Sequence, residues 1–311
     1  MDFRQQLTLI LARGLSAEAA ALAASGAVEG GVDDARRRRE LLGGLEARGM
    51  LRRGAAVAWP DEHCVAQLEK RLRHDEARLA WRGSVDYPAR LAESLGAEAP
   101  AWVWIAGAGE RLSGPAWAFV GSRQTEPPLL DAARRLAKAV ADAGITVASG
   151  MASGADAAAH DGARLGRAGT IAIPARGILE AGLSRRICRS LNMTALALGR
   201  PEEPFSAGLA IRRNAAIAAM GDGLLLVAGG LRGGSSHAVR WAIAWGRPLW
   251  CFDAGPGKTP AANRHLLREG LAEPLPVGEK PEQWLARMQE SLARNPARGK
   301  KSAGKQLDLL E

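Results

Sequence analysis

The sequence has few of the residues from which disulfide-linked or metal-bound scaffolds are built. Its 311 residues include only 3 cysteines, Cys64, Cys188 and Cys251, with no CxxC pair and no neighbouring histidine pair. This spacing excludes a disulfide framework and argues against structural zinc, so we expect no metal and no cofactor. No stretch approaches the roughly 20 apolar residues that cross a bilayer, and the first apolar run is too short for a secretory signal. We therefore expect a cytoplasmic protein without a membrane partner.

Acidic residues are outnumbered by basic ones. Lys and Arg total 42 against 33 Asp and Glu, which gives a formal net charge of +9. This balance favours a polyanionic partner, and nucleic acid before membrane, because no amphipathic anchor accompanies it. Arginine supplies most of the excess, and its guanidinium group can fork onto phosphates or stack on bases. The apolar fraction of 47% is that of a globular protein, and the length allows two domains.

Residues 1–80 are predicted to form a small helical domain. Apolar spacing indicates three helices, the second starting after Ser16 and the third capped by Asp33 or Asp34. Residues 50–59 resemble a short hairpin, and three helices followed by a hairpin is the order of a winged helix. The arginines that would contact duplex DNA in that case are Arg36, Arg37, Arg39, Arg52 and Arg53. The alternative is a helical domain with a solvated arginine face.

From about residue 115 short apolar runs alternate with amphipathic helices. The runs are residues 116–120, 145–148, 170–173, 194–198, 223–227 and 248–252. Uniformly apolar strands that alternate with helices indicate an α/β fold with a mostly parallel sheet covered on both faces. Such sheets bind ligands at the carboxyl ends of their strands.

Four segments with small or basic residues are expected at that edge of the sheet. Two follow the first two strands, one is expected to open a helix at residues 212–214, and one follows the fifth strand. Glycine lets the backbone approach an anion closely, and helix N-termini present free amides. The candidate ligand-binding residues are Gly121, Ser122, Arg123, Ser149, Gly150, Ser153, Gly154, Arg212, Arg213, Asn214, Gly233 and Ser235. Together they predict a long anion-binding groove.

Asp156 and His160 lie four residues apart on a predicted helix beside the second segment. We expect a structural role for both, because no serine or cysteine nucleophile with a paired base surrounds them. We therefore predict no catalytic residues. Trp241 and Trp245, also four apart, are interpreted as core residues or as a self-association face.

These segments carry a resemblance to the DNA-processing protein A family (DprA, also called Smf). The matching motifs lie at residues 87–91, 120–123, 149–160, 168–172, 213–218 and 263–272. The Ser149–His160 segment matches S-G-x-A-x-G-x-D-x-x-A-H in full. The sequence departs from the family pattern where Ala215 replaces an arginine, and where a shorter segment 177–191 carries Arg185, Arg186 and Arg189.

The resemblance implies an extended Rossmann-like domain over residues 81–286 that binds single-stranded DNA, forms a homodimer and assists the bacterial recombinase in DNA uptake or repair. The residues alone do not separate DNA from a nucleotide. One alternative is a regulatory or antitoxin-type module of a phage-defence locus. Another is an enzyme that cleaves nucleoside monophosphates, but the corresponding loop, residues 229–240, has no carboxylate for the chemistry.

Residues 287–311 are predicted to be a basic flexible tail, with a linker over residues 294–305. The tail ends in Gln306, Leu307, Asp308, Leu309 and Leu310. This pentapeptide resembles the bacterial motif Q-L-S/D-L-F/L that binds the replicative sliding clamp. The clamp is therefore a further expected partner.

Overall fold

The computed structural model describes residues 1–231 and 233–294. The N-terminal lobe consists of four helices: α1 (Phe3–Leu11), α2 (Ala17–Ala24), α3 (Ala35–Ala47) and α4 (Glu62–His74). Each starts after a side chain that accepts a hydrogen bond from a first-turn backbone N–H, and these N-caps are Asp2, Ser16, Asp34 and Asp61. The predicted helix starts after Ser16 and Asp34 are confirmed.

The predicted hairpin over residues 50–59 is wrong. This fully described segment contains no pair of strands. Its backbone instead makes one bridge with the α1–α2 connection, where Arg13 and Ala58 exchange hydrogen bonds of 2.9 and 3.0 Å. Gly14 allows this close approach, because a Cβ there would lie 2.5 Å from the Ala56 carbonyl oxygen. The lobe therefore has helices without a two-stranded wing.

A nine-stranded sheet forms the centre of the second lobe, in the order β1-β2-β6-β5-β4-β3-β7-β8-β9. The strands are β1 (Arg78–Trp81), β2 (Trp102–Gly107), β3 (Ala116–Val120), β4 (Thr146–Ser149), β5 (Thr170–Ala172), β6 (Met193–Ala197), β7 (Leu224–Leu226), β8 (Leu249–Asp253) and β9 (Glu273–Pro276). All pairs are parallel except β1–β2 and β2–β6. The predicted Rossmann-like, mostly parallel sheet and its six strands are confirmed.

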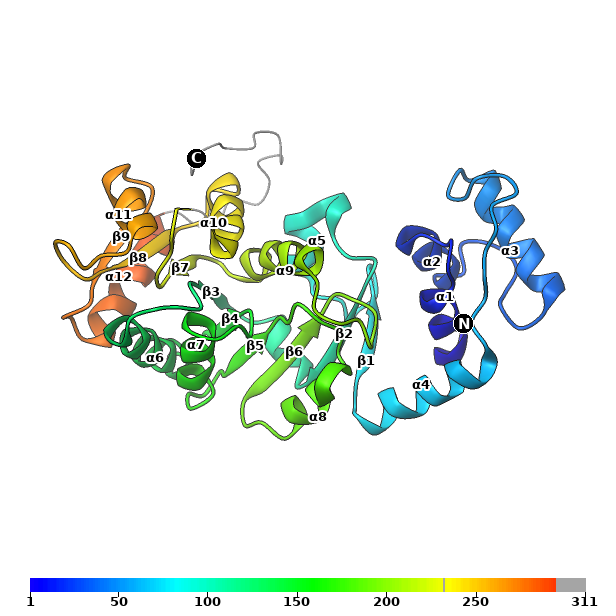
Figure 1. Ribbon diagram of the computed structural model, residues 1–311, viewed down its shortest axis with the longest axis horizontal. Coiled ribbons are helices and arrows are strands. Elements are labelled where there is room, and N and C mark those ends of the chain that lie inside the picture. Colours follow the sequence, from blue (N-terminus) through cyan, green and yellow to red (C-terminus); the bar gives the residue numbers. More distant parts are fainter. Residues whose placement is uncertain (232, 295–311) are drawn as a thin grey trace.

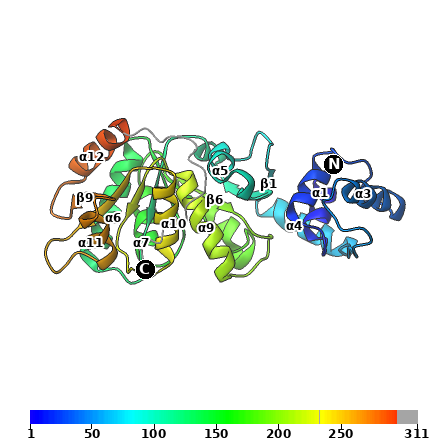
Figure 2. The same cartoon turned by 90° about the horizontal axis from the view of Figure 1, so that it is seen from above.

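Helices cover both faces of the sheet (Figure 1). They are α5 (Ala89–Leu95), α6 (Pro127–Asp142), α7 (Ala155–Ala163), α8 (Leu183–Cys188), α9 (Ala207–Met220), α10 (Gly234–Ala244), α11 (Ala261–Arg268) and α12 (Pro281–Arg294), with short 3-10 turns η1 (Gly96–Glu98), η2 (Gly109–Leu112) and η3 (Glu180–Gly182). One core lies between the sheet and α5, α9, α10 and α11, and a second lies under α6, α7 and α12. Helices α1, α4 and α8 pack over β2 and β6, which joins the N-terminal lobe to the sheet. Figure 2 shows that lobe projecting from the end of the sheet at β1.

The start of the predicted tail is also corrected. Residues 287–294 belong to α12, and the Trp284 and Met288 side chains of this helix are fully buried in the core. An amphipathic stripe therefore continues past residue 286, because apolar residues recur at helical spacing. The clamp-like motif, Gln306 to Leu310, lies outside the described residues.

Candidate functional site

The carboxyl ends of β3, β4 and β5 meet α9 around a pocket of about 310 Å³. Its lining residues are Arg123, Gly150, Met151, Ala152, Ser153, Pro174, Ala175, Arg176, Phe205 and Arg213. The two segments that follow β3 and β4 therefore meet, as their position at the carboxyl edge predicts. We call this cavity the strand-end pocket.

In the segment after β3, Arg123 is the exposed member of the Gly121-Ser122-Arg123 trio. The Ser122 N–H donates to the Ala228 carbonyl at 2.8 Å, and the Ser122 Oγ accepts from the Gln124 N–H at 3.0 Å. These bonds fix the turn, so that the Arg123 guanidinium projects from a rigid base. That arrangement suits a cation that contacts a phosphate.

The segment after β4 needs glycine at two positions. Gly154 has φ of +77°, and a Cβ there would lie 2.5 Å from the carbonyl oxygens of Ser122 and Arg123. A Cβ on Gly150 would lie 1.6 Å from Nη1 of Arg213. The segment is thus closely packed on both sides, and Ser153 is exposed between the glycines. Ser149 is fully buried and its hydroxyl donates to the Phe119 carbonyl at 2.7 Å, which ties β4 to β3.

The structure corrects the place of Arg212, Arg213 and Asn214. They do not open a helix but lie inside α9, which starts at Ala207 after the N-cap Ser206. The Ser206 hydroxyl accepts from the Leu209 N–H, a capping signal that the sequence analysis overlooked. As a result the three side chains point to different sides of one helix rather than to one loop.

Arg213 is 7% exposed and forms the floor of the strand-end pocket. Its Nη1 donates to the carbonyls of Gly150 and, at 3.3 Å, Ile173, and lies 3.7 Å from Oδ2 of Asp156. The same Asp156 oxygen accepts from the Ala152 N–H at 3.2 Å. Burial lowers the pKa of Arg213, which nevertheless remains protonated. Arg213 on α9 therefore links the segment after β4 to the segment after β5 through hydrogen bonds to a carbonyl of each.

Asp156 and His160 are buried, as a structural role requires. Burial raises the pKa of Asp156, and the nearby Arg213 offsets part of that shift. Burial lowers the pKa of His160 to about 4, so this imidazole is neutral near pH 7. Its Nδ1 is hydrogen-bonded with Thr170 Oγ1 at 2.8 Å. Both side chains thus stabilise the packing of α7 on the sheet.

Arg212 and Asn214 face away from the strand-end pocket. Asn214 Nδ2 donates to the Gly234 carbonyl at 2.7 Å, which fixes the start of α10, where Gly233 and Ser235 also lie. Arg212 is exposed and lines a different cavity, between the two lobes. Three of the four predicted segments therefore contribute to the strand-end pocket, through Arg123, Gly150 and Arg213, whereas Gly233 and Ser235 lie apart from it at the start of α10.

Six lining residues of the strand-end pocket were not among the predicted site residues, and two of them, Phe205 and Arg176, have side chains suited to nucleic acid. Phe205 is 54% exposed, and the Arg123 guanidinium carbon lies 6.0 Å from its ring centre. Arg176 lines the pocket from the segment after β5. In the sequence, Phe205 is marked only by its place before the helix cap Ser206, and Arg176 only by its place after a strand.

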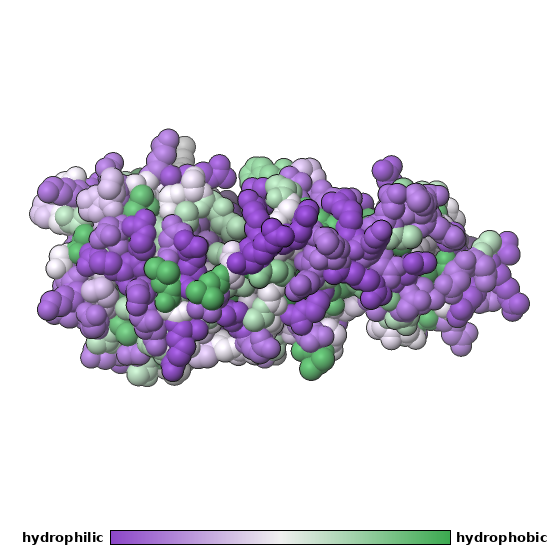
Figure 3. Space-filling model, turned by 90° about the horizontal axis from the view of Figure 1, so that it is seen from below, coloured by the Kyte–Doolittle hydropathy of each residue, from purple (hydrophilic) through white to green (hydrophobic). Residues whose placement is uncertain are grey.

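The N-terminal arginines are exposed on α3 and on the turn that follows it. Arg36 pairs with Glu40 at 3.1 Å and Arg37 with Asp33 at 3.0 Å, whereas Arg39, Arg52 and Arg53 extend into solvent. In the view of Figure 3 hydrophilic residues dominate the surface and apolar side chains are scattered.

Among residues 1–231 and 233–294, no group of three His, Cys, Asp or Glu side chains is placed to hold a metal ion. None of the described helices is long and apolar enough to span a membrane. Trp241 stacks on Trp245 at 4.9 Å, and both pack against the core under α10.

The Rossmann-like sheet places this chain among the α/β proteins, and the glycine-rich turns and arginines at the carboxyl ends of its strands are suited to contact an anion. The family described as DNA recombination-mediator protein A matches residues 78–289, and the chain belongs to this family. Protein Smf of Borreliella burgdorferi is 33% identical over 101 residues, which span 32% of this chain and 32% of that relative.

Two solved structures share the fold. DNA processing protein A from Helicobacter pylori, described for its single-stranded DNA binding mode, is 19% identical with a TM-score of 0.59, over 69% of this chain and 96% of that one. DprA from Streptococcus pneumoniae is 24% identical with a TM-score of 0.59, over 71% of this chain and 77% of that one.

Proposed function

We propose that this chain binds single-stranded DNA at the strand-end pocket and acts as a recombination mediator. The observation that carries the proposal is the gathering of Arg123, Arg176 and the exposed Phe205 ring around one pocket. Guanidinium groups neutralise phosphates, while an exposed aromatic ring stacks on any unpaired base, and this pairing is typical of single-strand binding. The described binding mode of the Helicobacter pylori relative supports this assignment.

The mediator role includes two further proposals. The chain would act as a homodimer, and it would assist a bacterial recombinase on the bound strand during DNA uptake or repair. Membership in the recombination-mediator family supports both. Since Asp156 and His160 are buried in structural contacts, we expect no turnover of nucleotides or DNA.

Replacing Arg123 by alanine should weaken single-stranded DNA binding about tenfold or more, equivalent to about 1.4 kcal/mol. The variant should also show a shallower dependence of affinity on salt, because one fewer phosphate contact releases fewer counterions. Fluorescence anisotropy at several salt concentrations measures both effects. Arg164→Ala is the matched control, since this arginine is similarly exposed at the far end of α7. Equal affinity and salt slope for the Arg123 and Arg164 variants would contradict the site.

We also propose that the terminal motif binds the sliding clamp. The proposal depends on the sequence of residues 306–310 alone, in which a glutamine and leucines have the order of the clamp-binding pentapeptide. Attachment to a DNA-binding chain would raise the effective concentration of that chain at the clamp. Micromolar binding to the clamp of the same organism is expected, and deletion of residues 306–311 should abolish it while DNA affinity stays unchanged. If the full and shortened chains bind the clamp equally, the motif has no such role.

A further inference from the structure

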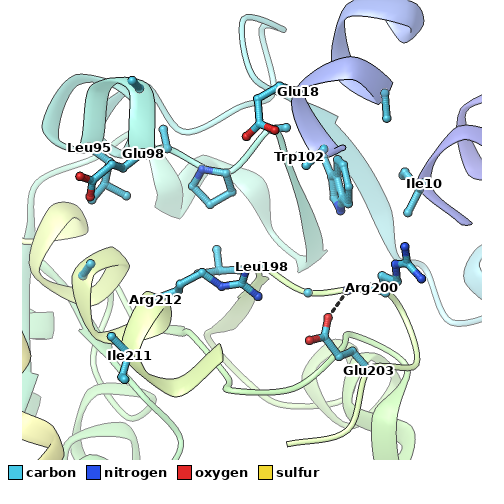
Figure 4. A pocket seen from close by; sticks show the side chains of 18 of the residues that line it. Ile10, Glu18, Leu95, Glu98, Trp102, Leu198, Arg200, Glu203, Ile211 and Arg212 are labelled. Carbon is cyan, nitrogen blue, oxygen red and sulfur yellow. Dashed lines mark hydrogen bonds between the residues drawn. The ribbon is translucent and has the colours of Figure 1, made fainter. Parts of the chain in front are cut away.

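A second cavity, of about 570 Å³, lies between the N-terminal lobe and the sheet (Figure 4). We call it the interlobe cleft. One wall comes from α1 and α2, another from η1 and the start of β2, and a third from the segment after β6 together with α9. Its volume falls within the range of small-ligand pockets, which are common where two domains meet.

Most of the lining is apolar, and its charged side chains are those of Arg200 and Arg212 with those of Glu18, Glu98 and Glu203. In Figure 4 the Arg212 guanidinium points into the cleft from α9, and the Glu18 carboxylate points in from α2 on the opposite wall. The Trp102 side chain lies at one side of the cleft, near Ile10. The Oε2 of Glu203 accepts from the Arg200 N–H at 2.8 Å, a backbone bond that fixes this carboxylate and leaves its negative charge in place.

The interlobe cleft and the strand-end pocket lie beside the same helix, α9. On α9, Arg213 lines the strand-end pocket and the preceding residue, Arg212, lines the cleft. Consecutive helical residues point about 100° apart, so the two cavities flank neighbouring sides of one helix. In the segment before α9, Phe205 lines the strand-end pocket and Glu203 lines the cleft. A strand bound in the strand-end pocket would therefore have to pass around α9 to enter the interlobe cleft.

We propose that the interlobe cleft is a second nucleotide subsite, which accepts a base of the same DNA strand. This inference rests on the function proposed for the strand-end pocket. Arg212 would hold a phosphate at the α9 wall, and the base would lie on the apolar surface beside Trp102. Glu18 repels phosphate, so the backbone stays on the Arg212 side.

The same carboxylate gives the subsite a base preference. Cytosine and adenine carry an exocyclic amino group that donates to a carboxylate, whereas thymine has none. We therefore expect oligodeoxycytidine to bind better than oligodeoxythymidine, provided that the strand is long enough to occupy both cavities. A single nucleotide contact of this kind discriminates by about tenfold.

The test compares labelled oligodeoxycytidine and oligodeoxythymidine in two lengths, about 4 and about 16 nucleotides, by fluorescence anisotropy. The long cytidine strand should bind about tenfold more tightly than the long thymidine strand, and Glu18→Ala should remove this difference. Arg212→Ala should weaken both long strands and leave the short ones unchanged. Glu93→Ala and Arg164→Ala are controls, since both side chains are exposed and outside the two cavities.

Three outcomes separate the inferences. If Arg212→Ala leaves the affinity for long strands unchanged while Arg123→Ala reduces it, the second subsite is wrong and the proposed function stands. Equal affinity of the wild-type protein for the two long strands would overturn the role of Glu18. If the wild-type protein binds neither length of either strand, the proposed function itself is wrong.

Discussion

Replacing Arg213 by alanine is expected to lower the free energy of unfolding by about 3–5 kcal/mol, because it breaks a buried ion pair at the floor of the strand-end pocket. The guanidinium is 7% exposed and lies 3.7 Å from the buried Asp156 carboxylate. Its removal leaves that charge without a cation, and it leaves the carbonyls of Gly150 and Ile173 without this donor. Urea unfolding followed by circular dichroism measures the loss.

The pH dependence of the Arg213→Ala variant offers a second readout. Burial raises the pKa of Asp156, and without Arg213 the shift is larger. A group whose pKa is raised in the folded state stabilises the fold at low pH and loses that contribution as pH rises through the folded pKa. The destabilisation should therefore be smaller in acid, where Asp156 is buried in its neutral form, than at pH 7.

Control variants distinguish this ion pair from the proposed DNA contact of Arg123. Arg123→Ala removes an exposed arginine and should reduce DNA affinity with no change in the urea midpoint. The double variant Asp156→Ala, Arg213→Ala should be less destabilised than the sum of its single variants, because no unpaired charge remains. An unchanged midpoint for Arg213→Ala would show that the ion pair does not anchor the segment after β4.

Local signals were enough to predict most of the sheet and the first helices. Uniformly apolar runs bounded by turns located β3 to β8, and hydroxyl or carboxylate caps located α2 and α3. The antiparallel strands β1 and β2 at the edge were missed, since their existence depends on pairing with each other and with β6. Such pairing between distant segments leaves no periodic pattern in either one.

The wrong predictions for residues 50–59 and for Arg213 also arise from contacts between segments far apart in the sequence. Residues 50–59 contain a turn signal at Arg53-Gly54, but their backbone bonds to Arg13, far away in the sequence. The predicted site includes Arg123, Gly150, Ser153 and Arg213, which line the strand-end pocket. It assigned Arg213 to an open loop, because burial against Gly150 and Asp156 is set by the fold and not by neighbouring residues. Residue types indicate which chemistry a segment can carry, whereas long-range packing decides which of its side chains are accessible.

Helix α12, part of which was predicted to be a flexible tail, contributes a large buried side chain to the core. The Trp284 side chain is fully buried, lies 5.3 Å from the Phe252 ring centre, and donates through Nε1 to the Pro276 carbonyl at 2.8 Å. Replacing Trp284 by alanine should lower the free energy of unfolding by about 3–5 kcal/mol, since a large cavity opens next to β8 and β9. The urea midpoint measures this change.

Two shortened chains test how much the last turns of α12 contribute to stability. A protein that ends at Arg294 keeps all of α12 and should match the full chain in its urea midpoint. A protein that ends at Ala286 loses the buried Met288, and should be destabilised by about 2–5 kcal/mol because removal of a core methionine side chain has that cost. Equal midpoints for the two shortened proteins would mean that the last turns of α12 add nothing to the core. The destabilisation caused by Trp284→Ala would then come from the first turns of α12 alone, where Trp284 is hydrogen-bonded to Pro276 at the end of β9.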